Sequence, residues 1–404
     1  MHKKESPTYN QHISTVLEFL YRNRHTSRIE ISNSTGLTPA LITSITGDLF
    51  KKNLIEETGD EKSEGSGRKR KILTLSKDFG YFLGIEFNVS GIYVMVTDLI
   101  GNEISKSHFT FNGENNDHLN KEIIDQINLC TQDIDHSQII GAGIALPGHY
   151  DYSNKKIVSN NLAWKCFDLD EIKKHFSFPF IVNNNVECMS LGEYLFHPDE
   201  SPEDFLFYHI GYGIYCSCFH AEQLRISENY YIGEVGHIVV DINGPQCECG
   251  KNGCLQTYIS ESWLIKNGKY LFRESSNSIL KSLVATEDEI TLDTIITAYK
   301  LGDPYFIKTI NLGLSLLSTS VANILMLHEC DKIYLNSKLF SYKAFQEQLI
   351  SLIQKQLEFI PDDHGINMQI EIVDFNQYRG ANSACALASF AFFIKSSDFE
   401  KYIV

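Results

Sequence analysis

The spacing of apolar and polar residues changes at about Tyr81 and divides the chain into two parts. In the first part, four apolar residues at helical spacing predict an amphipathic helix: Ile13, Val16, Leu17 and Leu20. Ser27 followed by Glu30 matches a capping box, which predicts a short second helix to about Ser34. A tight turn at 35–37 follows this second helix.

A third helix and a hairpin complete this first part. Thr38 is a suitable N-cap and Pro39 fits the first helical turn. The apolar face of this helix consists of Leu41, Ile45 and Leu49. Two strands, 54–58 and 71–75, then flank a glycine-rich turn. This order is typical of a winged helix-turn-helix, so we expect a DNA-binding domain over residues 1–78.

Candidate DNA contacts lie on the third helix and in the hairpin. Short side chains on the outer face of the helix could approach base edges in the major groove: Ala40, Thr43, Ser44 and Gly47. Phosphate or minor-groove contacts are expected from Thr38, Lys51, Lys52, Arg68, Lys69, Arg70 and Lys71. The alternative is a small helical interaction module with a solvated basic loop.

The second part alternates strands and helices. Three consecutive strands (81–87, 91–98 and 105–111), a helix (119–131) and a strand (139–145) come first, and a second strand-rich segment begins at 205. Repetition of this order predicts a duplicated α/β body with a cleft between two lobes. We expect the first lobe over 79–195, joined by a C-terminal helix at about 378–404. The second lobe is expected over 196–377, with the oligomerisation surface.

A compact set of metal ligands lies in the second lobe. His237, Cys247, Cys249 and Cys254 fall within eighteen residues, and Gly250 and Gly253 allow the chain to fold back between them. Three thiolates and one imidazole suit Zn²⁺, and four protein ligands leave no position for a catalytic water. We therefore expect a structural zinc site. A disulfide is the alternative interpretation.

Composition and charge place limits on the function. The net charge is −16, yet residues 1–75 carry twelve Lys or Arg against nine Asp or Glu, which leaves −19 for the rest. A slightly basic head on an acidic body indicates different partners for the two parts. No apolar run of about 18 residues predicts a membrane helix, and the N-terminus lacks a signal-peptide core. We expect a cytoplasmic protein with reduced thiols, associated with the nucleoid when bound to DNA.

Several motifs together resemble the ROK family of repressors, open reading frames and kinases, in particular its branch of NagC, Mlc and XylR-like repressors. The motifs are GSGRKRKILTL, ALPGHYD, SNNLAW (159–164), VNNNVECMSLGE (182–193), GEVGH, CECGKNGC and YRGANSACAL. The resemblance covers essentially the whole chain. It implies a ribonuclease-H-like, actin-like (ASKHA) fold with a sugar pocket between the lobes, and assembly into dimers or tetramers.

The resemblance also implies a set of sugar-binding residues. The matching positions are Gly148, Asn161, Asn184, Asn185, Glu234, His237 and Gln256. Gln256 stands where the family usually has Glu, which replaces an acceptor-only group with one that also donates. His237 would use one ring nitrogen for the metal and the other for a sugar hydroxyl. The alternative is a vestigial pocket whose polar groups bind one another.

Kinase activity is not expected, because the residues that such a reaction needs are replaced. The positions implied for the first phosphate loop are Glu86, Asn88 and Ser90, and those for the second are Gly211, Gly213 and Tyr215. Asn336-Ser337 stands in place of a glycine pair. Asn185 stands at the position of the catalytic Asp, and an amide cannot accept the hydroxyl proton as a general base. We expect no catalytic residue.

The chain is therefore interpreted as a DNA-binding transcriptional regulator, with repression of sugar uptake or catabolism genes as the expected activity and activation as the alternative. A homodimer would bind a pseudo-palindromic operator, and a sugar or sugar phosphate would control it. Two further alternatives stay open. One is control through sequestration by a protein partner, and the other is an ATP-dependent sugar kinase with a DNA-binding head.

Overall fold

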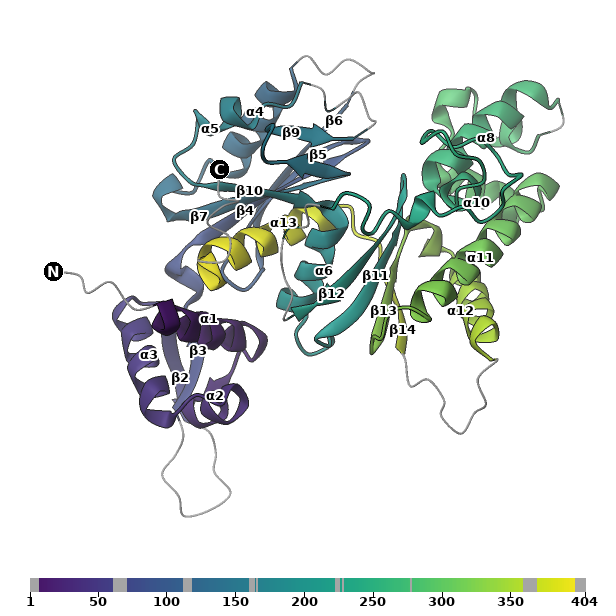
Figure 1. Cartoon of the computed structure of the whole chain (residues 1–404). Coiled ribbons are helices and arrows are strands. Elements are labelled where there is room, and N and C mark those ends of the chain that lie inside the picture. Colours follow the sequence, from purple (N-terminus) through teal and green to yellow (C-terminus); the bar gives the residue numbers. More distant parts are fainter. Residues whose placement is uncertain are drawn as a thin grey trace. The chain divides into compact units, whose positions relative to one another are not determined.

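The computed structural model describes residues 7–60, 71–111, 118–159, 164, 166–221, 226, 229–276, 278–358 and 369–396. The chain divides into two compact units (Figure 1). The first consists of Met1–Ser201 with Gln377–Val404, and the second of Pro202–Asn376. The C-terminal segment thus returns to the first unit. The finer division of the first unit into a head and a lobe stays a prediction.

The first unit begins with three helices and a small sheet. These elements are α1 (Pro7–Arg22), β1 (Thr26–Ser27), α2 (Arg28–Thr35), α3 (Pro39–Lys51), β2 (Ile55–Asp60) and β3 (Lys71–Leu75), with strand order β1-β3-β2. The predicted capping box is present, since Ser27 caps α2 together with Glu30. Gly36 ends α2 with φ at +70°, and Thr38 caps α3. The order of elements expected from the sequence is confirmed.

The apolar faces of these helices differ from expectation at two positions. Leu41 was expected in the core but is half-buried, and its neighbour Ile42 is fully buried. The core face of α3 therefore runs through Ile42, Ile45 and Leu49, which lie three and four residues apart as a helical stripe requires. On α1 the buried stripe continues past Leu20 to Tyr21, which is 1% exposed.

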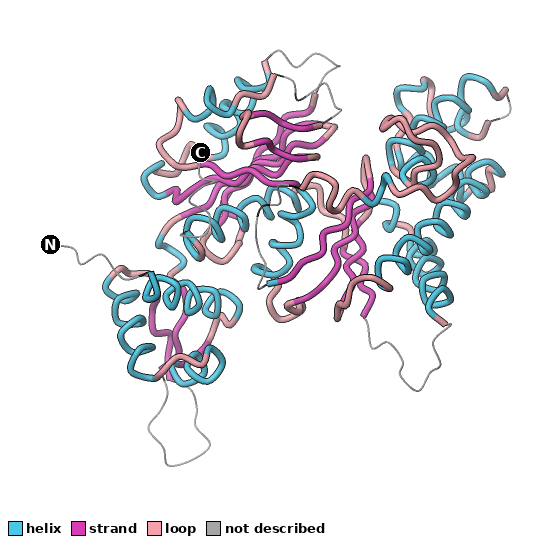
Figure 2. The backbone as a smooth tube through the Cα atoms, viewed as in Figure 1, coloured by secondary structure: helices cyan, strands magenta, loops and turns pink. Residues whose placement is uncertain are grey.

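A five-stranded mixed sheet forms the rest of the first unit, in the order β10-β7-β4-β5-β6 (Figure 2). Its strands are β4 (Tyr81–Asn88), β5 (Gly91–Thr97), β6 (Glu103–Thr110), β7 (Ile139–Leu146) and β10 (Phe180–Asn184). Its helices are α4 (Leu119–Cys130), α5 (Leu169–Lys173), α6 (Asn185–Phe196) and α13 (Arg379–Ser389), the last continued by a π-helical turn, Phe390–Ile394. A separate hairpin pairs β8 (His149–Asp151) with β9 (Lys156–Val158).

Alternation along β4 directs side chains to two different helix layers. Leu83, Ile85 and Phe87 belong to a core that also contains apolar residues of α4 and α5. Between them, Gly84 lies against the backbone of α13, and no space is left there for a side chain. The period of two in a strand explains why β4 reads as a nearly continuous apolar run, because both of its faces are buried.

The second unit contains a four-stranded sheet in the order β12-β11-β13-β14. The strands are β11 (Asp204–Ile210), β12 (Ile214–His220), β13 (Lys332–Asn336) and β14 (Gln369–Val373). The main helices are α7 (Gln256–Ile259), α8 (Glu261–Glu274), α9 (Leu280–Leu283), α10 (Leu292–Lys300), α11 (Pro304–Leu325) and α12 (Lys343–Leu357). One large apolar core joins this sheet to α8, α10, α11 and α12.

The two sheets differ in one detail from the expected duplication. Within the described residues, the second sheet has one antiparallel hairpin, β11–β12, where the first has a three-stranded meander. After β12 the described chain forms turns and a 3₁₀ turn, Val235–His237, which leads into the cysteine-rich segment. The helices described by the structure include none that is both long and apolar enough to cross a bilayer.

Candidate functional site

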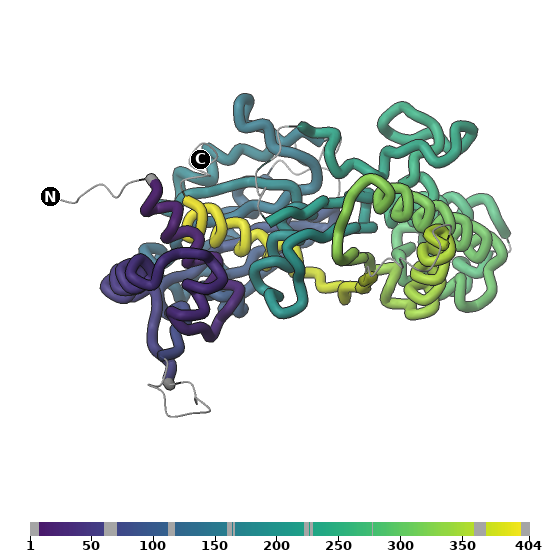
Figure 3. Tube along the Cα trace, turned by 60° about the horizontal axis from the view of Figure 1, so that its bottom comes forward, coloured from purple at the N-terminus to yellow at the C-terminus, as the bar shows by residue number. Residues whose placement is uncertain are grey.

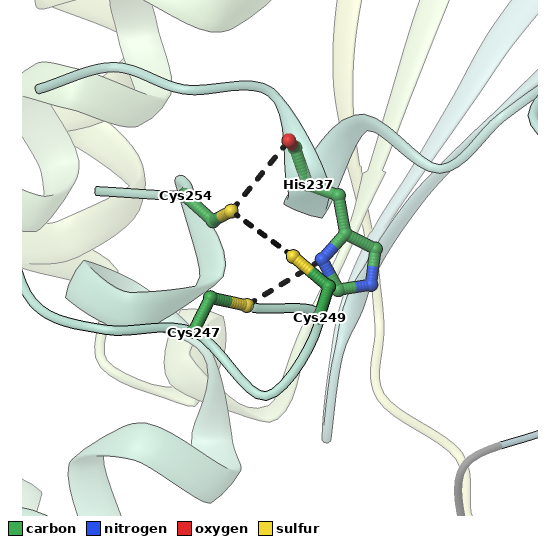
Figure 4. Close-up of side chains that lie close together, drawn as sticks. All are labelled: His237, Cys247, Cys249 and Cys254. Carbon is green, nitrogen blue, oxygen red and sulfur yellow. Dashed lines mark hydrogen bonds between the residues drawn. The ribbon is translucent and has the colours of Figure 1, made fainter. Parts of the chain in front are cut away.

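The four predicted metal ligands lie together in the second unit (Figure 4). His237 ends the 3₁₀ turn, and Cys247 and Cys249 lie in the loop that follows. Cys254 lies two residues before the start of α7. Gly250 and Gly253 have φ of +88° and +67°, so the loop reverses through backbone conformations that favour glycine. The ligand atoms of the histidine and the three cysteines all lie within 4.8 Å of one another. The cluster could hold a metal ion.

The spacing of these atoms fits a tetrahedral ion. A Zn²⁺ ion with thiolate and imidazole ligands sets sulfur–sulfur edges of about 3.8 Å and sulfur–nitrogen edges of about 3.5 Å. The Cys249 and Cys254 sulfurs are 3.6 Å apart, and Cys247 Sγ lies 3.5 Å from Nδ1 of His237. The second ring nitrogen of His237 points away from the three sulfurs (Figure 4). The donor set and its dimensions therefore suit a closed four-ligand site.

Polar groups around the cluster hold it in place. Gln256 Nε2 donates to Cys247 Sγ at 3.4 Å, and Lys251 Nζ donates to the His237 carbonyl at 2.8 Å. Burial, followed by the neighbouring thiols of Cys249 and Cys247, raises the pKa of Cys254 to about 12. A cation at the centre would reverse this balance, because metal binding requires the thiolate form.

The candidate DNA contacts on α3 form an exposed surface. Ala40, Thr43 and Ser44 are exposed, and Gly47 is half-buried. Thr43 Oγ1 donates to the Pro39 carbonyl within the helix at 2.8 Å. Thr38, Lys51 and Lys52 at the two ends of α3 are exposed.

The basic residues of α3 and the hairpin are partly paired. Lys51 forms an ion pair with Asp48 at 2.7 Å, and Lys71 on β3 forms one with Glu57 at 2.7 Å. Exposed pairs of this kind are weak and exchange readily for phosphate contacts. Arg68, Lys69 and Arg70 lie outside the described residues.

The predicted sugar contacts fall in both units. In the first unit, Asn184 caps α6 and Asn185 is its first residue. Asn184 Nδ2 donates to the Gly148 carbonyl at 2.9 Å, so these two expected contacts are joined directly. Gly148 has φ of +104°, where a side chain would be strained. Asn161 lies outside the described residues.

In the second unit, the remaining expected sugar contacts lie beside the metal cluster. Glu234 immediately precedes the 3₁₀ turn that ends in His237, and Gln256 begins α7. The amide nitrogen of Gln256 faces a metal-ligand sulfur, an interaction that a glutamate carboxylate could not make as a donor. Its assignment as a sugar contact remains a prediction, as do those of the other six positions.

Comparison with known proteins identifies the family. The model of the ROK family matches residues 82–390, well over half of the chain. The chain belongs to the ROK family. The resemblance predicted from the sequence motifs is confirmed.

Curated proteins similar to this chain are named as transcriptional regulators. The xylose repressor of Bacillus spizizenii (strain ATCC 23059 / NRRL B-14472 / W23) is 30% identical over 292 residues, which cover 71% of this chain and 72% of that protein. The DNA-binding transcriptional dual regulator NagC of Escherichia coli (strain K12) is 25% identical over 284 residues, or 69% of this chain and 68% of NagC.

Solved structures show the same fold in both regulators and kinases. A ROK family transcriptional regulator, a homologue of the E. coli Mlc protein, aligns with a TM-score of 0.72 at 22% identity, over 96% of this chain and 100% of its own. The ROK glucokinase of Streptomyces griseus, in complex with glucose and AMPPNP, aligns with a TM-score of 0.62 at 20% identity, over 76% and 99%. The mixed α/β ROK fold is thereby established.

In the first unit, the residues expected at the first phosphate loop form hydrogen bonds within the protein. Glu86 is 3% exposed, and its carboxyl group accepts hydrogen bonds from the backbone N–H groups of Gly380 and Ala381 at the start of α13. A Cβ on Gly380 would collide with this carboxyl group. In the adjoining turn, Asn88 Oδ1 accepts from the Ser90 amide at 3.4 Å. The Asn88 side chain therefore accepts a backbone N–H group within the β4–β5 turn.

The β11–β12 turn of the second unit is closed in a similar way. Ser337 Oγ donates to the Ile210 carbonyl at 2.5 Å, and His209 Nδ1 lies 2.8 Å from Asn336 Oδ1. The Tyr215 ring is buried and packs directly on Gly233. These contacts tie the turn to the end of β13 and to the segment that precedes Glu234.

Glu86 gives a testable dependence of stability on pH. Burial raises the pKa of its carboxyl to about 8, against the hydrogen bonds from Ala381 and Gly380. Because the folded-state pKa exceeds the unfolded value, the contribution of Glu86 to stability is complete below about pH 4.5 and is lost as the pH rises through 8. The Glu86→Gln variant lacks this loss. Its unfolding free energy minus that of the wild type should therefore increase by a few kcal/mol as the pH rises from 5 to 8.

Urea unfolding at a series of pH values measures this difference. Glu103→Gln, which removes an exposed carboxyl on the edge strand β6 of the same sheet, is the control and should change little over the same range. A constant difference between wild type and Glu86→Gln from pH 5 to 8 would show that Glu86 stays ionised in the folded protein.

Some residues that organise the first unit were missed from the sequence. Tyr21, Arg22 and Arg24 connect α1 to the lobe, with partners as distant in sequence as Phe196 and Ser389. Tyr21 continues the apolar stripe of α1 and could have been found by extending that pattern one residue. The carbonyl partners of the two arginines carry no side-chain signal.

Proposed function

We propose that this protein is a sequence-specific DNA-binding repressor of sugar uptake or catabolism genes, controlled by a small sugar. The observation that carries the proposal is the attachment of a three-helix head with a hairpin to a ROK body. Similar curated proteins are named xylose repressor and N-acetylglucosamine repressor. A ROK transcriptional regulator of known structure aligns with 96% of this chain, whereas the ROK glucokinase structure aligns with 76% of it. The extra segment is where a regulator needs its DNA contacts.

The head is proposed to be a winged helix-turn-helix with α3 as the recognition helix. The left-handed Gly36 and the cap at Thr38 set a tight α2–α3 turn, and β2–β3 supplies the wing. The exposed face of α3 carries small side chains and no Lys or Arg among its predicted base contacts. Base readout there would be supplemented by the basic residues of the wing.

The DNA target is proposed to be a pseudo-palindromic operator bound by a homodimer or by two heads of a tetramer. Symmetric assemblies bind half-sites whose separation follows the two-fold axis. An effector acts by binding one conformation more tightly than the other, which changes the separation of the two heads. The cytoplasm is the expected compartment for this activity.

D-Xylose is the first effector to test. Similar relatives from Bacillus and Caldicellulosiruptor are named xylose repressors, at 27–30% identity for three of them. The amide and carboxyl groups at Asn184, Asn185, Glu234 and Gln256 provide donors and acceptors for the hydroxyl groups of a neutral sugar. N-Acetylglucosamine and its 6-phosphate are the second class, on the basis of the similarity to NagC.

The metal is proposed to be a structural Zn²⁺ held by His237 and the three cysteines. Zinc supplies four strong bonds that fix the loop between the 3₁₀ turn and α7. Because Glu234, His237 and Gln256 lie at the two ends of that loop, the ion would also hold the proposed sugar contacts in register.

Kinase activity is proposed to be lost. Asn185 at the start of α6 cannot act as the general base, since its amide has no basicity to accept a hydroxyl proton. The buried Glu86 carboxyl group already accepts hydrogen bonds from the N–H groups at the start of α13, so these donors are not available to a phosphate. Together, these two features argue against phosphoryl transfer even though the fold is shared with kinases.

A thermal-unfolding screen of the intact protein tests the ligand class. The panel contains D-xylose, glucose, N-acetylglucosamine, their phosphates, and ATP with Mg²⁺. A sugar at about 100 times its Kd should stabilise the protein by about 2.7 kcal/mol and raise Tm by several degrees. A rise with ATP and Mg²⁺, accompanied by ADP release, would contradict the proposal. Silence across the panel would favour control by a protein partner.

A further inference from the structure

Helix α1 of the head is fixed on the first lobe by a buried tyrosine. Tyr21 is 1% exposed; its hydroxyl donates to the Leu99 carbonyl and accepts from Ser389 Oγ. The ring of Tyr21 lies edge-on to that of Phe393, with centroids 6.0 Å apart. Figure 3 shows α1 in dark purple beside the yellow C-terminal segment. A buried phenol that both donates and accepts fixes the position of α1 against the lobe.

The arginines at and just beyond the end of α1 hold backbone carbonyl groups at and beyond the end of α6. Arg24 Nη2 donates to the carbonyl of Phe196, the last residue of α6, at 2.9 Å. Arg22 Nη2 donates to the Ser201 carbonyl at 2.6 Å, and its guanidinium lies 4.3 Å from the centre of the Tyr194 ring. Carbonyls at a helix C-terminus lack intrahelical partners and carry the negative end of the dipole, which suits guanidinium donors.

A half-buried charged group links the same elements. Glu18 on α1 accepts a hydrogen bond from Tyr194 of α6 at 3.0 Å and pairs with Lys395 at 2.8 Å. The side chains of Glu18 and Lys395 are 17% and 24% exposed, so this pair is shielded from much of the solvent. The head therefore contacts α6 and the C-terminal segment together.

The opposite end of α6 carries the proposed sugar contacts. Asn184 Oδ1 accepts from the Val186 amide at 2.8 Å and caps the helix, while its amide group holds the Gly148 carbonyl. Asn185 is the first residue of α6. A helix of 12 residues is about 18 Å long and moves as a rigid body. A displacement at its N-terminus is thereby transmitted to the carbonyls that the arginines hold.

Arg22 also reaches the point where the chain leaves the first unit. Ser201 is the last residue before the crossing to Pro202, and its hydroxyl donates to the Glu193 carbonyl of α6 at 3.0 Å. The Glu193 carboxylate pairs with Arg379, which follows the return crossing. A change in backbone direction at the crossing moves the carbonyl that Arg22 binds.

We propose that Arg22 and Arg24 couple the sugar site and the inter-unit crossing to the DNA-binding head. This inference rests on the proposed function and adds the residues that transmit the signal. Movement of α6 or of the crossing breaks or re-forms the bonds to the Phe196 and Ser201 carbonyls, which rotates α1 on the lobe. Both bonds are charge-assisted and directional, so a shift of about 1 Å is enough to break them.

The test compares the effect of sugar on DNA binding in wild type and in an Arg22→Ala/Arg24→Ala double variant. Operator DNA is first selected from random sequence with the intact protein. Fluorescence anisotropy then measures operator affinity with and without D-xylose, or the sugar that raises Tm in the screen. In wild type, sugar should weaken operator binding by ~10-fold or more. In the double variant the same sugar should change it by less than ~2-fold, although it still raises Tm as in wild type.

Arg273→Ala is the matched control, because this arginine pairs with Glu287 within the second unit and should leave the response unchanged. Arg22→Lys retains one donor for the Ser201 carbonyl. This variant should therefore keep part of the sugar response that the double alanine variant loses. Full release of the double variant by sugar would overturn the inference while leaving the proposed function intact. A wild type that binds no specific DNA, or binds it regardless of every sugar, would overturn both.

Discussion

Replacing Cys254 by serine should release the metal ion and lower the melting temperature of the protein by about 10 °C or more. Cys254 is completely buried, and its sulfur lies 3.6 Å from that of Cys249. Loss of a structural metal belongs to the small class of changes that cost more than about 4 kcal/mol, and each kcal/mol lowers Tm by a few degrees in a domain of this size. Elemental analysis and calorimetry measure the two effects.

Cys166→Ser provides the control, because Cys166 is an exposed thiol in the first unit. It should retain one metal ion per chain and the wild-type Tm. Chelation of the wild type should reproduce the Cys254→Ser phenotype, and should also weaken the binding of any sugar found in the screen. A Cys254→Ser variant with full metal content and unchanged melting would contradict the structural metal site.

Replacing Arg68, Lys69 and Arg70 by alanine should weaken operator binding by about 100-fold or more and flatten its dependence on salt. Each phosphate contact contributes about 0.9 to the slope of log K against log salt concentration, and a dimer loses six cations. The magnitude of the slope should therefore fall by about 5. Anisotropy titrations at roughly 50 to 300 mM salt measure both the affinity and the slope.

The control removes the same charge elsewhere. Lys106, Lys155 and Lys343 each form an exposed ion pair outside the head. Their triple alanine variant should leave the slope unchanged, since only cations at the interface release counterions. An unaltered slope in the Arg68/Lys69/Arg70 variant would show that the hairpin does not contact DNA.

The elements of the head could be predicted because each has a local chemical signal. Each signal involves residues only three or four positions apart: the capping box of Ser27 and Glu30, the left-handed Gly36, and the Thr38-Pro39 start of α3. The structure contains all of them. The metal cluster was predictable for the same reason, since its ligands are close in sequence and Gly250 and Gly253 mark the reversal between them.

Features that depend on contacts between distant segments could not be predicted. The bonds of Arg22 and Arg24 end on carbonyl groups, which every residue carries. The second role of Gln256, as a donor to Cys247, follows from the position of α7 and not from the spacing of the ligands. Among the residues that the structure describes, the second sheet has a hairpin where the sequence predicts a three-stranded meander, because apolar spacing alone does not distinguish a strand from an extended turn.

The central claim is that a ROK body controls a sequence-specific DNA-binding head in response to a sugar. The most direct measurement is the affinity of the intact protein for its selected operator and for random duplex at physiological salt, each titrated with D-xylose. We predict a preference for the operator of about 10³-fold or more, and a loss of operator affinity of about 10-fold or more with sugar. Equal affinity for operator and random duplex would contradict the account.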